Sequence, residues 1–163
     1  MPEKVVCNTS PLIFLAKIRK LALLDRYTLY IPSLVKAEVA KGLKHNKQDA
    51  RLIMEHLSRN NIQPSKVTPL KDLPPFLGSG EKAAISLAVR EGITRIFIDE
   101  AKARTVARFK GLAPKGTLGI LWDAYKSGAV EKDTIELLVF DLIQNGYRIR
   151  EEIIVEFLKR LKH

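Results

Sequence analysis

The chain alternates short apolar runs with longer segments in which apolar residues recur every three or four positions. The short runs are rich in Val, Ile, Leu and Phe, a pattern typical of buried strands. The predicted strands are Val5–Cys7, Leu29–Ile31, Ile62–Val67, Arg95–Ile98 and a brief one at Leu112. Because Pro64 cannot donate a backbone hydrogen bond, the third of these is expected at a sheet edge or as an irregular strand.

The longer segments have the periodicity of helices that pack one face on a core. The predicted helices are one or two short ones within Pro11–Leu24, then Ser33–Lys41, Asp49–Asn60, 80–89, Glu100–Lys110, Thr117–Ser127, Glu131–Asn145 and Arg150–Leu161. The proline-rich segment Thr68–Ser79 predicts a loop. Strands separated by helices favour a parallel sheet covered on both faces. The predicted fold class is therefore α/β, a three-layer α/β/α arrangement around a central parallel sheet.

We expect residues 1–163 to form a single domain, because this length supports a substantial core and the composition does not change sharply along the chain. Within it, residues 131–163 are an appended helical pair that packs on the sheet or on a second subunit. Trp122 and Tyr125 belong either to the core, as large aromatics in helices usually do, or to a dimer contact.

Four side chains with oxygen atoms interrupt apolar stretches and suggest a metal site. Asn8 and Asp99 directly follow predicted strands, and in parallel sheets ligands bind at the carboxyl ends of the strands. Glu38 lies at the edge of the apolar stripe of its helix, where a carboxylate is costly unless it is paired or ligated. Glu81 opens the next helix and shares a face with apolar residues.

Each of these residues also has a structural interpretation. Asn8 and Asp99 occupy positions where they would cap a helix or form a turn. An acid such as Glu81 in a first helical turn is favoured by the helix dipole whatever its function. That argument does not extend to Glu38, which makes the metal interpretation stronger for Glu38 than for Glu81.

Several polar residues near these positions are candidates for nucleic-acid contacts. Thr9 and Ser10 form the corner after the first strand, where hydroxyl and backbone N–H groups bind phosphate, although turn formation is the stronger interpretation for Thr9. Lys102 and Arg104 follow Asp99 within about one and a half helical turns, and either meets a phosphate or forms a structural ion pair.

The charge of the chain fits a polyanionic partner. The formal net charge is +10 and the isoelectric point is near 9.8, with basic residues spread along the chain. Lysines and arginines release counterions from a nucleic-acid backbone and steer its approach, but basic proteins without nucleic-acid partners also exist. The charge therefore supports a nucleic-acid partner but is not sufficient evidence for one.

The remaining titratable residues suggest no thiol or zinc chemistry. Cys7 is the single cysteine and is expected as a small buried hydrophobe in a reducing interior. His45, His56 and His163 lack the paired spacing of a zinc site and are expected at the surface. Without a signal pattern or a run long enough to cross a bilayer, the protein is expected to be cytoplasmic and not membrane-bound.

The ordered motifs of this chain resemble those of the PIN-domain ribonucleases, in particular a prokaryotic branch whose members begin with an Asn-Thr-Ser-Pro-Leu-Ile type motif. The matching segments are Asn8–Ile13, Ile31–Val35 with Glu38, Gly80–Ala88, Phe97–Glu100 with Ala103 and Arg104, and Gly116–Leu121. Each segment alone is a weak signal, whereas the ordered set is specific and extends to about Ser127.

The resemblance implies a metal-dependent endoribonuclease that uses Mg²⁺ or Mn²⁺ to hydrolyse RNA. By position in the motifs, Glu38, Glu81 and Asp99 match the family's catalytic acids, and all three match metal ligands together with Asn8. Asn8 stands where the family usually has its first Asp, and it offers a carbonyl oxygen without a negative charge. The resemblance also suggests a homodimer and, as one role, the toxin of a toxin–antitoxin pair with an antitoxin protein as partner.

Two other interpretations remain open from the sequence. A degenerate PIN fold would bind RNA or a protein without cutting, and the loss of charge at Asn8 is its best argument. A nucleotide-binding or receiver-type α/β domain would share the layout, but no glycine-rich phosphate loop follows the first strand. Receiver domains also need an early acid pair, where only Glu3 is present.

Overall fold

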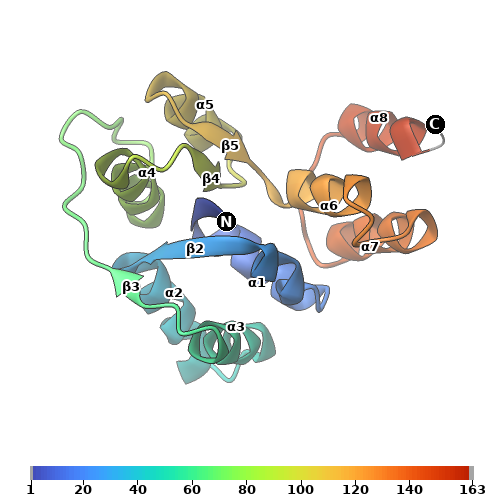
Figure 1. Cartoon of the computed structure of the whole chain (residues 1–163), viewed down its shortest axis with the longest axis horizontal. Coiled ribbons are helices and arrows are strands. Elements are labelled where there is room, and N and C mark those ends of the chain that lie inside the picture. Colours follow the sequence, from blue (N-terminus) through green and yellow to red (C-terminus); the bar gives the residue numbers. More distant parts are fainter. Residues whose placement is uncertain (1, 162–163) are drawn as a thin grey trace.

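A five-stranded, entirely parallel sheet forms the middle layer of the protein (Figure 1). The computed structural model describes residues 2–161. The strands are β1 (Glu3–Cys7), β2 (Tyr27–Pro32), β3 (Pro64–Ser65), β4 (Arg95–Phe97) and β5 (Ala113–Lys115), arranged in the order β3-β2-β1-β4-β5. β3, which contains Pro64, is an edge strand as predicted, but it covers only Pro64–Ser65 of the predicted Ile62–Val67. The strand predicted at Leu112 begins one residue later, at Ala113. The chain leaves β1 toward β2 and later returns to its other side as β4, so β1 and β4 flank the point where ligands bind in such sheets.

Helices cover both faces of the sheet, which confirms the predicted three-layer α/β fold. They are α1 (Thr9–Lys17), the 3₁₀ helix η1 (Leu21–Arg26), α2 (Ser33–Lys44), α3 (Gln48–Arg59), α4 (Ser79–Glu91), α5 (Ala101–Phe109), α6 (Thr117–Lys126), α7 (Lys132–Gln144) and α8 (Glu151–Leu161). Between residues 2 and 161, no helix has both the length and the apolar character needed to cross a bilayer.

The alternation of side chains along the strands creates two hydrophobic clusters. Val5 and Cys7 point into one cluster with α1, α2, α3 and the C-terminal helices, and Val6 points into the other with α4 and α5. β4 divides in the same way, with Phe97 on the first side and Ile96 on the second. Because successive strand residues face opposite layers, a strand buried on both faces needs the continuous apolar run found in the sequence.

Several helix boundaries differ from the prediction by one or two residues, and the end of α2 differs by more. The sequence suggests an end at Lys41, before Gly42, whereas α2 continues to Lys44. Gly42 is where α3 comes close, since a β-carbon at Gly42 would lie only 2.8 Å from the β-carbon of Ala50. The glycine therefore serves helix packing and not helix termination.

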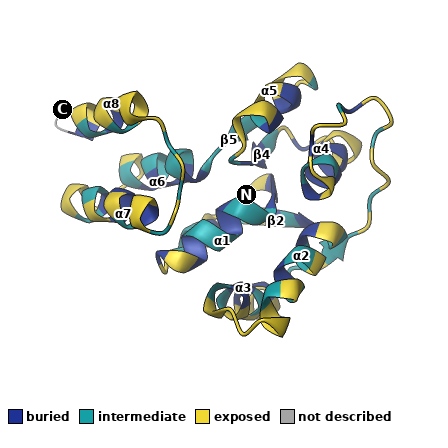
Figure 2. Ribbon diagram, turned by 180° about the vertical axis from the view of Figure 1, so that it is seen from behind, coloured by how far each residue is buried: buried dark blue, intermediate teal, exposed yellow. Residues whose placement is uncertain are grey.

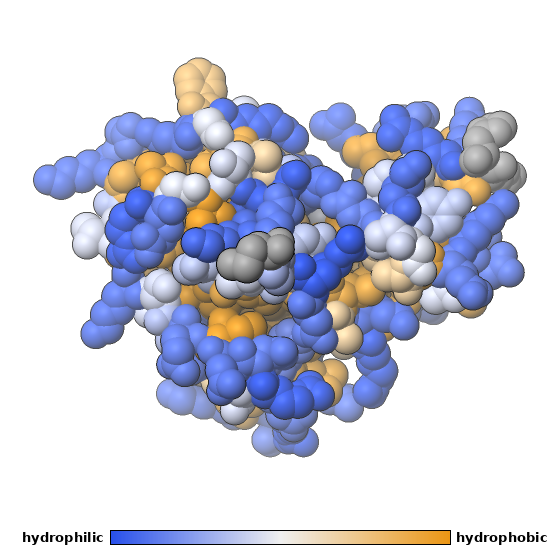
Figure 3. Space-filling model, in the orientation of Figure 1, coloured by the Kyte–Doolittle hydropathy of each residue, from blue (hydrophilic) through white to orange (hydrophobic). Residues whose placement is uncertain are grey.

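The C-terminal helices pack through aromatic contacts. Figure 2 shows many exposed positions along α7 and α8. The ring centroid of Trp122 in α6 lies 5.4 Å from that of Phe157 in α8 and 5.5 Å from that of Tyr125. Buried residues of α7 and α8 join the cluster that covers Val5 and Cys7. On the surface, Leu137 and Phe140 of α7 are 70% and 53% exposed. Figure 3 shows a mostly hydrophilic face with separate hydrophobic patches.

We predict that Phe157→Ala destabilises the protein by about 3 kcal/mol, because it removes a buried aromatic ring from the contact with Trp122. Val155→Ala, at an exposed position of the same helix, should change stability by less than about 0.5 kcal/mol. Urea unfolding followed by tryptophan fluorescence and far-UV circular dichroism measures both. Trp122 is the only tryptophan, so two separate transitions would show that the C-terminal helices are not part of one cooperative domain.

Candidate active site

Asn8 lies at the junction between β1 and α1, next to the end of β4. Its backbone N–H donates a 3.0 Å hydrogen bond to the carbonyl oxygen of Phe97, which extends the pairing of the two strands. Its side chain is buried and makes no capping hydrogen bond to α1, although the residue occupies the capping position. Within residues 2–161, Oδ1 of Asn8 is the one buried side-chain nitrogen or oxygen without a hydrogen-bond partner. Such an oxygen costs about 1–3 kcal/mol unless another group satisfies it.

The Asp99 carboxylate is the most heavily hydrogen-bonded group of the site. Oδ1 accepts from the backbone N–H of Thr117 at 2.6 Å and from the Tyr147 hydroxyl at 2.9 Å. Oδ2 accepts from the hydroxyl groups of Ser10 at 2.8 Å and Thr117 at 2.7 Å. A carboxylate has about four lone-pair positions, so these donors use its accepting capacity. Asp99 does cap a helix, as its structural interpretation suggested. The capped helix is α6, which begins at Thr117, and not α5, which follows Asp99 in sequence.

A glycine makes room for this arrangement. A β-carbon at Gly116 would lie 2.8 Å from Oδ1 of Asp99 and 3.3 Å from both the Arg104 guanidinium and the Tyr147 hydroxyl. The Arg104 guanidinium donates a hydrogen bond to the backbone carbonyl oxygen of Asp99. Arg104 therefore supports the Asp99 backbone from the side of α5.

Tyr147 is a site residue that the sequence did not indicate. It follows α7 directly after Gly146, whose positive φ of 90° permits the turn that brings the ring back toward the sheet. The ring packs edge-on against Phe14 with centroids 5.0 Å apart. Burial raises the pKa of the Tyr147 hydroxyl, and the charge of Asp99 and the hydrogen bond to it raise that pKa further. The hydroxyl therefore remains protonated and acts as a donor.

Glu38 joins α2 to the beginnings of α1 and α4. Its Oε2 accepts a 2.6 Å hydrogen bond from the Thr9 hydroxyl. A β-carbon at Gly80 would lie 2.5 Å from Oε1 of Glu38, so the carboxylate sits directly against the first turn of α4. The partial positive charge at the beginnings of two helices stabilises a carboxylate in this place.

Glu81 has a demonstrable structural role. Its Oε1 accepts a 2.9 Å hydrogen bond from the backbone N–H of Gly78, which caps the beginning of α4. The side chain is half-buried and faces the same hollows as Asn8. Capping uses one oxygen of Glu81. That Glu81 also binds a metal remains a prediction.

The four predicted ligands line two adjoining hollows at the carboxyl edge of the sheet. Hollow A, of about 540 Å³, is lined by Asn8, Glu38 and Glu81, and hollow B, of about 300 Å³, by Asn8, Glu81 and Asp99. Ser10 and Phe14 line both. Arg148, which follows Tyr147, lines hollow B and is a second residue that the sequence did not indicate.

Of the predicted nucleic-acid contacts, the structure places Ser10 inside the site and Arg104 beside it. Lys102 instead lies against Phe76, with Nζ 5.8 Å from the ring centroid. It does not line hollow A or hollow B. Lys102 is therefore close to Asp99 in sequence without lining the hollows that the acids line.

The donor chemistry of the site fits a hard divalent cation, because it combines carboxylates with the unsatisfied carbonyl oxygen of Asn8. In the present arrangement, no three His, Cys, Asp or Glu residues among residues 2–161 lie close enough to share a metal. Glu38, Glu81 and Asp99 each direct at least one oxygen at a protein donor. Because four donors occupy both oxygens of Asp99, binding a metal through that carboxylate requires one of its hydrogen bonds to be exchanged.

Cys7 precedes Asn8 and is fully buried, as predicted. Burial raises the pKa of its thiol, and the nearby charge of Asp99 raises it further. A thiol with a raised pKa is neutral and a poor nucleophile. The side chain therefore contributes packing to the site and no covalent chemistry.

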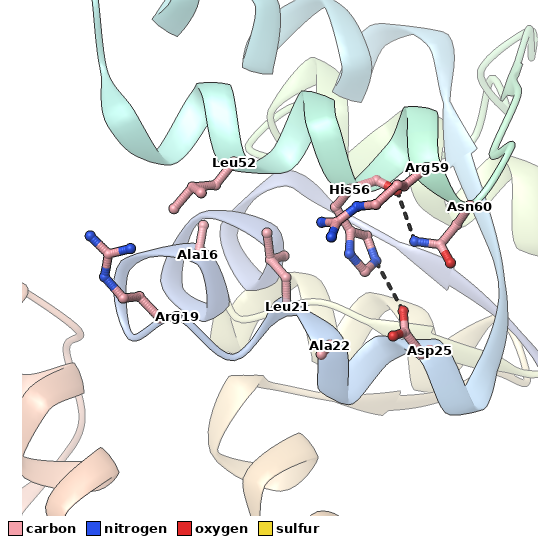
Figure 4. Close-up of a pocket in the computed structure, with 9 residues that line it drawn as sticks. All are labelled: Ala16, Arg19, Leu21, Ala22, Asp25, Leu52, His56, Arg59 and Asn60. Carbon is pink, nitrogen blue, oxygen red and sulfur yellow. Dashed lines mark hydrogen bonds and ion pairs between the residues drawn. The ribbon is translucent and has the colours of Figure 1, made fainter.

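A separate pocket between α1, η1 and α3 corrects the expectation for the histidines (Figure 4). His45 is exposed and His163 lies outside the described residues, but His56 is only 3% exposed. It points toward Asp25, with Nε2 3.5 Å from Oδ1. Burial lowers the pKa of His56, while Asp25 opposes that effect and Arg59 adds to it. His56 falls on the apolar face of α3 with Ile53 and Leu57, a position whose burial its helical spacing could have indicated.

Comparison with known proteins gives one family. The DUF3368 family model, described as a PIN domain, matches residues 4–163. A comparison with curated proteins gives no match. The PIN-domain family model spans almost the whole chain, including the C-terminal helices and the segment between α7 and α8 that supplies Tyr147 and Arg148.

We predict that Gly116→Ala destabilises the protein by about 1–3 kcal/mol, because the added methyl group displaces Asp99 from its hydrogen bonds. The backbone itself tolerates alanine, since φ at Gly116 is −91°. Gly119→Ala in α6 is the matched control, where the new methyl group meets ordinary contacts and helix propensity favours alanine. Thermal and urea unfolding compare the two variants, and equal stability would show that Gly116 does not hold space for Asp99.

Proposed function

Because this chain belongs to the PIN-domain family, we propose that it is a metal-dependent endoribonuclease that hydrolyses RNA phosphodiester bonds. The observation that carries the proposal is the convergence of Asn8, Glu38, Glu81 and Asp99 on two hollows that share walls. These residues come from four places in the sequence and meet where β1 and β4 end. The residues that match the family's motifs are the ones that line these hollows, which supports the proposal.

In this proposal, Glu38, Glu81 and Asp99 are the catalytic acids, and together with Asn8 they hold the cation. Mg²⁺ or Mn²⁺ suits oxygen ligands of this kind. When bound, such an ion supplies a water of lowered pKa and neutralises charge on the scissile phosphate. Asn8 contributes its carbonyl oxygen, which has no partner within residues 2–161. The three carboxylates supply the negative charge that Asn8 lacks.

The RNA backbone is held by donors around the acids. Ser10 lies in the first turn of α1, where backbone N–H groups and the hydroxyl favour an anion. Arg148 lines hollow B beside Asp99, and Arg104 supports the Asp99 backbone from behind. We retain Lys102 as a more distant contact to the RNA backbone, on the surface near Phe76. The net charge of +10 steers the polyanion toward the protein.

The biological role follows from the family resemblance. We propose that the protein acts as a cytoplasmic homodimer and, as one role, as the toxin of a toxin–antitoxin pair with an antitoxin protein as partner. The exposed Leu137 and Phe140 support self-association, because residues three positions apart are neighbours on a helix surface. They lie on α7 and line neither hollow.

A second candidate function is favoured by the hydrogen bonds of Asp99. A PIN fold that binds RNA or a protein partner without cutting would need no cation, and its acids would serve as structural acceptors. Asp99 accepts four hydrogen bonds from the protein, and Asn8 removes one negative charge from the ligand set. These observations favour the non-cutting candidate, and a cleavage assay distinguishes it from the endoribonuclease.

We predict that the purified protein cleaves a labelled mixed-sequence RNA with Mn²⁺ or Mg²⁺ and loses activity with EDTA. The Glu38→Gln/Asp99→Asn variant should lose at least about 100-fold in rate, because its ligands no longer carry charge. Glu55→Gln/Asp133→Asn is the matched control, since both residues are exposed and line neither hollow. RNA binding without cleavage would favour the non-cutting candidate, and cleavage that survives EDTA and the double substitution would contradict the proposal.

We predict that Asn8→Asp strengthens Mn²⁺ binding and that Asp99→Asn weakens it, because the first adds and the second removes a charged ligand oxygen. Each change should alter the dissociation constant by about tenfold or more, on the scale of one charged hydrogen bond or ligand. Titration calorimetry without RNA measures these constants. Equal affinity in the wild-type protein and both variants would remove the proposed site.

A further inference from the structure

We propose that Tyr147 is a positioning residue that fixes Oδ1 of Asp99, so that Oδ2 is the oxygen presented to the cation once the Ser10 hydroxyl turns away. The inference rests on the proposed metal site and deepens it. It assigns different tasks to the two oxygens of one carboxylate. It also makes the segment between α7 and α8 part of the site.

The two donors on Oδ1 are fixed in place. One is the backbone N–H of Thr117, which cannot move without the first turn of α6. The other is the Tyr147 hydroxyl, whose ring is half-buried and packed edge-on against Phe14. A rigid ring cannot withdraw its hydroxyl unless the whole side chain leaves this contact. Oδ1 is therefore committed to the protein.

On Oδ2, by contrast, one of the two donors is free to leave. Thr117 donates from a buried side chain, but Ser10 is half-buried and borders both hollows. A serine hydroxyl exchanges between staggered positions by a single rotation about χ1. In the first turn of α1 no preceding turn restricts that rotation. Turning Ser10 exposes one lone pair of Oδ2 toward hollow B without any change in the backbone.

The position of Gly116 supports the same division of tasks. The absence of a side chain there leaves space into which Oδ1 and the Tyr147 hydroxyl both fit. Outer hydrogen bonds of this kind orient metal ligands, and their loss typically lowers metal affinity by about 10–100-fold. Tyr147 thereby links the orientation of Asp99 to the packing of the C-terminal helices.

The test is Mn²⁺ titration calorimetry of the full chain without RNA, with variants of opposite expected sign. Tyr147→Phe keeps the ring contact with Phe14 and should weaken Mn²⁺ binding by about tenfold. Ser10→Ala removes the competing donor and should strengthen binding by about fivefold, the scale of one hydrogen bond. Tyr125→Phe is the control, because Tyr125 is also a half-buried tyrosine but packs on Trp122 and lines neither hollow.

Opposite shifts for Tyr147→Phe and Ser10→Ala, with Tyr125→Phe unchanged, support the inference, because a merely structural loss would weaken binding in both. Unchanged or tighter binding by Tyr147→Phe overturns it, since the hydroxyl would then be neutral or a competitor of the cation. Weaker binding by Ser10→Ala also overturns it. No Mn²⁺ binding by the wild-type protein would overturn the inference together with the metal site, whereas the other adverse results overturn the inference alone.

Discussion

The hydrogen bonding of the Asp99 carboxylate is the interaction on which the rest of the site depends. A half-buried carboxylate loses hydration and must recover it from protein donors. Asp99 does so through Ser10 of α1, Thr117 of α6 and Tyr147 beyond α7, so three separate parts of the chain converge on the end of β4. The same contacts that satisfy one charge also fix the walls of hollow B.

The negative charge at this edge of the sheet is balanced mainly by dipoles and hydroxyl groups. Glu38 faces a threonine hydroxyl and the beginning of α4, and Glu81 accepts from a backbone N–H. Neutral donors stabilise carboxylates without the permanent pairing that an arginine would impose. Such an arrangement holds the acids in place while leaving some of their hydrogen bonds exchangeable, which suits a site proposed to receive a cation.

The sequence was informative where function depends on the ends of regular elements. Asn8 and Asp99 could be placed at one edge because each follows an apolar run, and parallel strands align their carboxyl ends. Tyr147 could not be found in this way, because it meets Asp99 across 48 residues and no local pattern records that contact. The role of Gly42 could not be predicted for the same reason, since it depends on the approach of α3 and not on α2 itself. The family resemblance was confirmed, while the tasks of the individual acids remain predictions.

The burial of Cys7 has a practical consequence for labelling this protein at a single introduced cysteine. It is the only cysteine, and its neutral, enclosed thiol leaves the native protein without a site for maleimide or nitroxide reagents. If a cysteine were introduced on the outer face of α8, a thiol-reactive probe would therefore label that cysteine and not Cys7. With Trp122 as the energy donor and a fluorescent probe on α8 as the acceptor, energy transfer would then report the separation between α6 and α8.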